Sequence, residues 1–142
     1  MKIVINRCYG GFGLSEQAVI RYHEILGIPV WVEHDSKFAS MGITHYWLVP
    51  PEQRVENQED RWHTMTLEER QEYNLQWRQQ TFHPGSVNRA DTTLVQVVEE
   101  LGTAANSRFS ELKVVEIPDG VDWEIDEYDG IEHVAERHRT WS

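Results

Sequence analysis

The chain has 142 residues, about the length of one ordinary domain, which is enough to bury a single hydrophobic core. Its formal net charge of -11 argues against a general nucleic-acid surface, which needs a basic stripe to displace counterions. Ten of the 13 basic residues are Arg. This bias suits bidentate contact with a small phosphate ligand, and a surface preference without functional meaning explains it equally well.

The cysteine and histidine content limits the chemistry further. Cys8 is the single cysteine, so the sequence predicts neither an internal disulfide nor a Cys-rich zinc site. The seven His lack the paired spacing of a zinc-binding helix, and no metal or other cofactor is expected. We expect no signal peptide, and no apolar run approaches the ~20 residues of a membrane helix. A soluble, cytoplasmic protein is therefore the expectation.

The first third of the chain is predicted as strand, glycine loop, helix and two strands. Residues 2–6 form a β-branched strand that leads into the loop over 8–15. Ser15 is the predicted N-cap of a helix that Gly27 ends. Strands follow over 29–33 and 43–49. The apolar face of the helix is predicted to consist of Ala18, Tyr22, Ile25 and Leu26.

The segment from about 52 to 90 is polar and poor in aliphatic residues. Thr66 and Glu69 have the spacing of a capping box, which predicts a helix from Leu67 to near Gln79. Because such a helix has little apolar surface of its own, we expect it to pack on another subunit or over a ligand pocket. The segment is predicted to be an insertion or a pocket-covering element.

The last third begins with a loop over 82–89. Asp91 is the predicted N-cap of an amphipathic helix that ends at Gly102, and residues 112–117 form a strand. A hairpin of strands 123–128 and 131–135 follows, joined by the type I′ turn pair at 129–130. The predicted cross-strand pairs are Ile125 with Val134, Asp126 with His133, and Tyr128 with Ile131. A C-terminal helix that starts at Ile131 is the competing prediction.

These elements predict an α+β fold in a single domain over residues 1–142. Strands and helices do not alternate as a doubly wound parallel sheet requires. We expect a small mixed or antiparallel sheet, about three helices and the C-terminal hairpin.

Two loops are candidates for ligand contact. The glycines at 10, 11 and 13 follow a strand and precede a helix, as in phosphate-binding loops, and a tight strand-to-helix turn would also need them. Phe82, Asn88 and Arg89 offer a stacking ring, an amide and a guanidinium within eight residues, although a mixed surface loop would look the same. Cys8 is read as a small buried residue rather than a nucleophile, and the sequence contains no convincing catalytic constellation.

Several motifs resemble the phage Thoeris anti-defence sequestering proteins of the first type. The opening motif is NRCYGGFGLS over residues 6–15, and the middle motifs are FHPG over 82–85 and NRAD over 88–91. The later motifs are LKVVEIP over 112–118, EYDG over 127–130 and RTW over 139–141. The likeness covers nearly the whole chain, and residues 52–80 are the least similar part.

The resemblance implies a protein that captures a cyclic ADP-ribose isomer (gcADPR), the Thoeris signal, without degrading it. It implies homodimers that assemble further, pockets at the dimer interface, and cyclic oligonucleotides as additional ligands of some members. A phage-encoded protein of this kind would act in the cytoplasm of its bacterial host. A nucleotide phosphodiesterase or glycohydrolase and a protein-interaction domain are the competing functions.

The resemblance also assigns ligand contacts to individual residues. Cys8 and Phe12 would line the pocket, Phe82 beside His83 would pack on adenine, and Arg108 would face phosphate. The family pattern has an Asn near the start of the helix, where this chain has Thr. The residues expected to close over the ligand are Asn88, Arg89, Asp91, Thr92 and Thr93.

Overall fold

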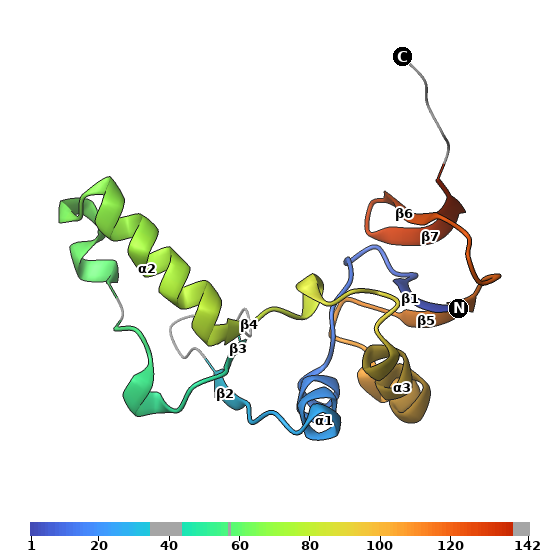
Figure 1. Ribbon diagram of the computed structural model, residues 1–142, viewed down its shortest axis with the longest axis horizontal. Helices are drawn as coiled ribbons and strands as arrows, with labels where there is room; N and C mark the ends of the chain where they lie inside the picture. The colour runs from blue at the N-terminus through green and yellow to red at the C-terminus, as the bar shows by residue number, and fades with distance from the viewer. Residues whose placement is uncertain (35–43, 57, 138–142) are drawn as a thin grey trace, which may run out of the picture. The chain divides into compact units, whose positions relative to one another are not determined.

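The computed structural model describes residues 1–34, 44–56 and 58–137 (Figure 1). The chain divides into two compact units, one of residues Met1–Gly27 and Pro84–Ser142, the other of Ile28–His83. Three α-helices and small antiparallel sheets confirm the predicted α+β class. The second unit contains most of the polar segment predicted over about 52–90. It begins at Ile28, before that segment, and ends at His83, before the segment's predicted end. The single-domain organisation stays a prediction.

The first unit is built on a two-stranded antiparallel sheet. Strand β1 (Lys2–Asn6) pairs with β5 (Leu112–Glu116), in the register that sets Val4 opposite Val114. Helices α1 (Glu16–Leu26) and α3 (Thr92–Leu101) contact each other, and α3 contacts both strands. The core consists of buried residues from these elements: Ile3, Val4, Ile5, Ala18, Val19, Leu94, Val95, Val97 and Val98.

The predicted helix caps of this unit are confirmed. The Ser15 hydroxyl accepts the Ala18 backbone N–H at 3.1 Å, and Gly27 has the left-handed conformation (φ 70°) that ends α1. One part of the predicted apolar face is wrong, because Leu26 is 43% exposed whereas His23 is buried. Leu26 is the last residue of α1. Helix α3 is followed directly by a short 3-10 helix, η5 (Gly102–Ala105).

The C-terminal hairpin has the predicted register. Strands β6 (Trp123–Tyr128) and β7 (Ile131–Glu136) place Ile125 opposite Val134 and Tyr128 opposite Ile131. The turn residues Asp129 (φ 50°) and Gly130 (φ 88°) both have positive φ, as a type I′ turn requires. The alternative of a helix from Ile131 is wrong, because β7 occupies those residues. The motif at 139–141 lies outside the described residues.

The second unit contains a three-stranded antiparallel sheet in the order β2-β3-β4. Its strands are β2 (Trp31–His34), β3 (Thr44–Trp47) and β4 (Thr81–Phe82), so the predicted strand over 29–33 begins two residues late. Ile43 of the predicted strand 43–49 lies outside the described residues. The predicted loop over 82–89 begins as β4 and contains a 3-10 turn, η4 (Pro84–Ser86).

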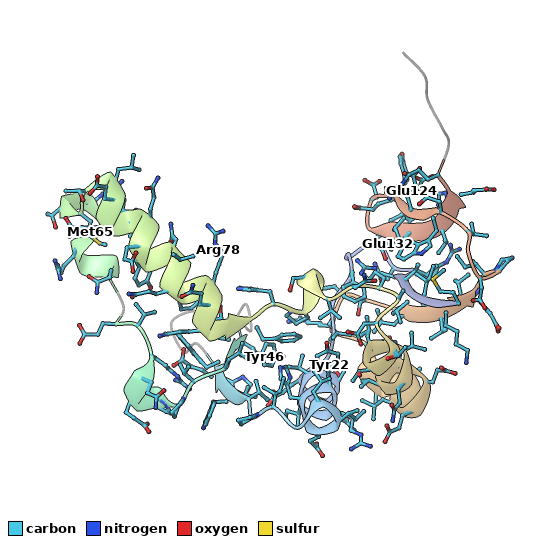
Figure 2. All side chains as sticks on the ribbon, viewed as in Figure 1. Tyr22, Tyr46, Met65, Arg78, Glu124 and Glu132 are labelled. Carbon is cyan, nitrogen blue, oxygen red and sulfur yellow. The ribbon has the colours of Figure 1, made fainter. Side chains whose placement is uncertain are left out.

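Helix α2 (Leu67–Gln80) of the second unit has the predicted capping box, and it has no buried residue. It is preceded by the 3-10 helices η2 (Pro51–Gln53) and η3 (Glu59–Thr64). Tyr46 and Trp47 of β3 are buried, and the Trp47 ring contacts that of Trp77 on α2; Tyr46 is labelled in Figure 2. None of the helices in the described ranges is long and apolar enough to cross a bilayer.

Candidate functional site

The glycine loop of the first unit packs closely against residues 107–109. A Cβ atom on Gly10 would overlap the carbonyl oxygen and the Cβ of Phe109, and one on Gly13 would lie 2.7 Å from Ser107 Oγ. At Gly10 the overlap is partly with backbone and is costly to relieve, whereas a side chain at Gly13 would require Ser107 to shift. The glycines therefore fix how the loop meets the segment that carries Arg108.

The hairpin turn packs on the same loop. A Cβ atom on Gly130 would overlap the Tyr9 carbonyl and lie 2.7 Å from the Gly11 nitrogen. Loop and turn line an open hollow of about 500 Å³, with the Glu127 and Asp129 side chains on the turn's side. Since these carboxylates repel an anion, the phosphate-binding part of a site would lie away from the turn.

Asn6 is a fully buried hub that holds the start of the loop. Its Nδ2 donates to the carbonyl oxygens of Cys8 and Gly130, each at 2.7 Å. Its Oδ1 accepts the backbone N–H groups of Cys8 at 3.2 Å and Glu111 at 2.9 Å. Cys8 is a half-buried free thiol whose backbone is fixed by this hub.

Arg89 and Phe12, both predicted site residues, lie together. The Arg89 guanidinium carbon is 3.5 Å from the centroid of the Phe12 ring. Arg89 Nη1 and Nη2 also donate to the two oxygens of Glu132 at 2.6 and 3.0 Å. Because Glu132 already compensates its charge, Arg89 acts on the loop by fixing the Phe12 ring. Sequence reasoning did not identify Glu132, which pairs with a residue 43 positions away.

The residues at the start of α3 use their polar groups within the chain. Asn88 Oδ1 accepts the Ala90 N–H at 2.9 Å, and Asp91 Oδ1 accepts the Thr93 N–H at 2.8 Å. The Tyr22 hydroxyl donates to Asp91 Oδ2 at 3.2 Å. Burial, and then the Asp91 carboxylate, raise the pKa of Tyr22 above its ordinary value. Thr92 is the exposed side chain of this turn.

Arg108 is a predicted site residue whose guanidinium is available at the surface. It is exposed, with its guanidinium carbon 5.2 Å from the Phe109 ring centroid. Over the part of the chain that the structure describes, it has no acidic partner. Phe109 is 61% exposed, and Tyr9, on the other side of Gly10 in the loop, is 72% exposed. Sequence reasoning missed both rings, although each adjoins a residue that it had singled out.

Phe82 and His83 belong to the second unit. Phe82 is half-buried, its ring 6.5 Å from that of Tyr46 on the neighbouring strand. His83 Nε2 lies 3.0 Å from the Thr81 hydroxyl. The loop that the sequence presented as one recognition segment is thus divided between the units after His83.

On the hairpin, exposed His133 Nε2 lies 3.4 Å from Asp126 Oδ2. Within the described ranges, no group of three or more His, Cys, Asp or Glu side chains is arranged to hold a metal ion. Comparison of this chain with protein-family models, with curated proteins and with solved structures gives no match.

Proposed function

We propose that the chain is a phage anti-defence protein that binds and sequesters a cyclic ADP-ribose isomer, the signal of Thoeris immunity, without degrading it. It would act in the cytoplasm of the bacterial host, as a homodimer or an assembly of dimers. The proposal is supported by the motifs that resemble the sequestering family. Among the structural features, the exposed Arg108 over the exposed Phe109 ring supports it best, and exposed Tyr9 adjoins Gly10, which packs on Phe109.

These three side chains offer what an adenine diphosphate ligand needs. A guanidinium without an acidic partner can donate to two phosphate oxygens at once. An exposed aromatic ring beside it can stack on a base, whichever base the ligand carries. The contact of Gly10 with Phe109 fixes the distance between the loop and these groups before the ligand arrives. Such preorganisation lowers the ordering cost of binding, which favours the slow release that sequestration requires.

The experiment incubates the protein with gcADPR, removes free ligand, denatures the protein by heat and identifies the released molecule by chromatography and mass spectrometry. We expect intact gcADPR in proportion to protein. A chemically altered product would refute sequestration in favour of a phosphodiesterase or glycohydrolase. No retained ligand would refute binding altogether.

A pair of charge-removing variants tests the role of Arg108. Arg108→Gln should weaken gcADPR binding at least about tenfold, the scale of a charge-assisted hydrogen bond. Lys113→Gln removes one positive charge from an exposed position on β5 of the same unit and should change the affinity by less than about twofold. Equal losses in the two variants, measured by calorimetry, would show that net charge rather than the Arg108 site governs binding.

A further inference from the structure

The second unit contains a pocket of about 320 Å³ that uses none of the residues discussed as nucleotide contacts. This volume is within the range of small-molecule sites. Strands β2 and β3, the chain after η2 and helix α2 all contribute to its wall. Its principal lining residues are Glu33, His45, Trp47, Arg54, Tyr73 and Trp77.

Ring-bearing side chains contribute to this wall together with the charged Glu33 and Arg54. Trp47 and Trp77 meet edge to face, with centroids 4.9 Å apart, and His45 lies against Trp77 at 5.2 Å. Trp77 belongs to α2, so these ring contacts join the helix to β3. Walls of this kind bind flat, weakly polar bodies through dispersion and ring contacts.

Arg54 provides the polar group of the pocket, and one side of its guanidinium is unused. Its Nη1 donates to Glu33 Oε2 at 3.0 Å, and its Cζ lies 4.9 Å from the Trp47 ring centroid. Its Nε is buried and has no hydrogen-bond partner in the structure as described. A buried donor without an acceptor is uncommon and carries a free-energy cost, which an acceptor brought by a ligand would remove.

The unused edge is the one with which Arg binds two-oxygen groups. Nε–H and one N–H of Nη2 are parallel, and together they match the two oxygens of a carboxylate. The same unit shows this edge in use, because Arg70 Nε and Nη2 both donate to the Trp62 carbonyl at 3.0 and 2.7 Å. In Arg54 the hydrogen bond from Nη1 to Glu33 orients the guanidinium. Of the two nitrogens on the unused edge, Nε is buried away from water.

We propose that this pocket binds a small, flat molecule carrying a carboxylate, with its oxygens on Arg54 Nε and Nη2 and its ring against Trp47 and Trp77. A phosphate monoester presents similar oxygens. The Glu33 carboxylate on the other side of Arg54 disfavours a second negative charge, so the monoanion is preferred. The pocket shares no lining residue with the proposed nucleotide contacts.

Benzoate, benzamide and phenyl phosphate test the proposal as defined probes. Each is titrated into the full chain, and ¹H–¹⁵N NMR follows the Arg Nε–H and Trp Nε1–H signals. Benzoate should shift the Arg54 and Trp47 signals with a millimolar dissociation constant. The neutral benzamide and the dianionic phenyl phosphate should each bind at least about tenfold more weakly. Equal binding of benzoate and benzamide, or no shift with benzoate, would overturn the proposal. Phenyl phosphate binding more tightly than benzoate would overturn the preference for a monoanion.

Variants test whether Arg54 causes the preference for benzoate over benzamide. Arg54→Lys keeps the charge and removes the fork, and it should abolish the preference for benzoate over benzamide. Arg78→Lys makes the same change at an exposed position on α2 and should leave the preference intact (Figure 2). Glu33→Gln, which retains Arg54, should tighten phenyl phosphate binding because the competing carboxylate is gone. A preference that survives Arg54→Lys, or no gain in Glu33→Gln, would refute the assignment to Arg54. The Glu33→Gln measurement decides the question if Arg54→Lys unfolds.

Discussion

Replacing Glu132 by Gln tests how the glycine loop is held. Glu132 Oε1 accepts both the Asn6 backbone N–H at 2.8 Å and Arg89 Nη1 at 2.6 Å, while Oε2 accepts Arg89 Nη2 at 3.0 Å. The amide oxygen of Gln can replace one carboxylate oxygen. Its NH₂ group then faces a donor of Arg89, so a hydrogen bond is lost and the guanidinium is left without a compensating charge.

The expected cost follows from the burial of the pair. The side chains of Glu132 and Arg89 are only 8% and 16% exposed, so water screens their attraction weakly. Breaking a buried pair by changing one partner costs about 3–5 kcal/mol, most of it from the charge that stays buried alone. We expect Glu132→Gln to lower the free energy of unfolding of the first unit by about that amount. That is a large fraction of the stability of a small domain.

Native-state hydrogen exchange of the β1 amides measures this cost, because these amides are buried and exchange when the first unit opens. Glu99→Gln is the matched control, since Glu99 pairs with Lys2 of the same strand but both side chains are nearly half exposed. The control should cost less than about 1 kcal/mol. A cost for Glu132→Gln as small as that of Glu99→Gln would refute the role of this pair in holding the loop.

Three further predictions concern the loop, pH and the ligand. Gly10→Ala should destabilise the first unit by about 1–3 kcal/mol through overlap with Phe109, whereas Gly85→Ala, where no atom lies within 4 Å of the new Cβ, should be nearly neutral in urea unfolding. Because burial and Asp91 raise the folded-state pKa of Tyr22 above 10.0, its contribution to stability is complete below that pH and is lost as pH rises through the folded pKa. Tyr22→Phe should therefore reduce the loss of stability between about pH 8 and about pH 11, and an unchanged loss would contradict the assignment. The adenine contact that the resemblance assigns to Phe82 predicts that Phe82→Ala weakens gcADPR binding by about 1–3 kcal/mol in calorimetry, and an unchanged affinity would remove this ring from the site.

The features predicted correctly from sequence are those whose cause is local. Ser15 and Asp91 cap helices through groups two or three residues away. The type I′ turn at 129–130 needs two residues that tolerate positive φ, and it determines the register of the strands on both sides. Each of these signals is contained in a window of a few residues, so tertiary structure is not needed to read it.

The features that sequence could not supply depend on distant partners. The close approach of Phe109, 99 positions further along the chain, requires Gly10, which does not have a positive φ. Arg89 is a predicted ligand contact because Arg suits phosphate, and the structure adds Glu132 of β7 as its partner. Nothing near position 89 indicates that partner. The division of the chain after His83 also depends on a distant partner. Strand β4 forms only by pairing with β3, which lies more than 30 residues earlier.

The Arg residues that lie over aromatic rings form two groups, according to whether the guanidinium also has a hydrogen-bond acceptor. Within the described chain, four Arg lie over aromatic rings: Arg54, Arg70, Arg89 and Arg108. The first three also donate to a carboxylate or a backbone carbonyl, so the ring contact is part of the packing of their own unit. Arg108 has only its ring. Composition cannot distinguish these cases, since the residue types are the same and only the acceptor differs. A guanidinium with no acceptor from the described protein stays hydrated until a ligand supplies one, and for that reason Arg108, rather than Arg89, is the phosphate contact we propose.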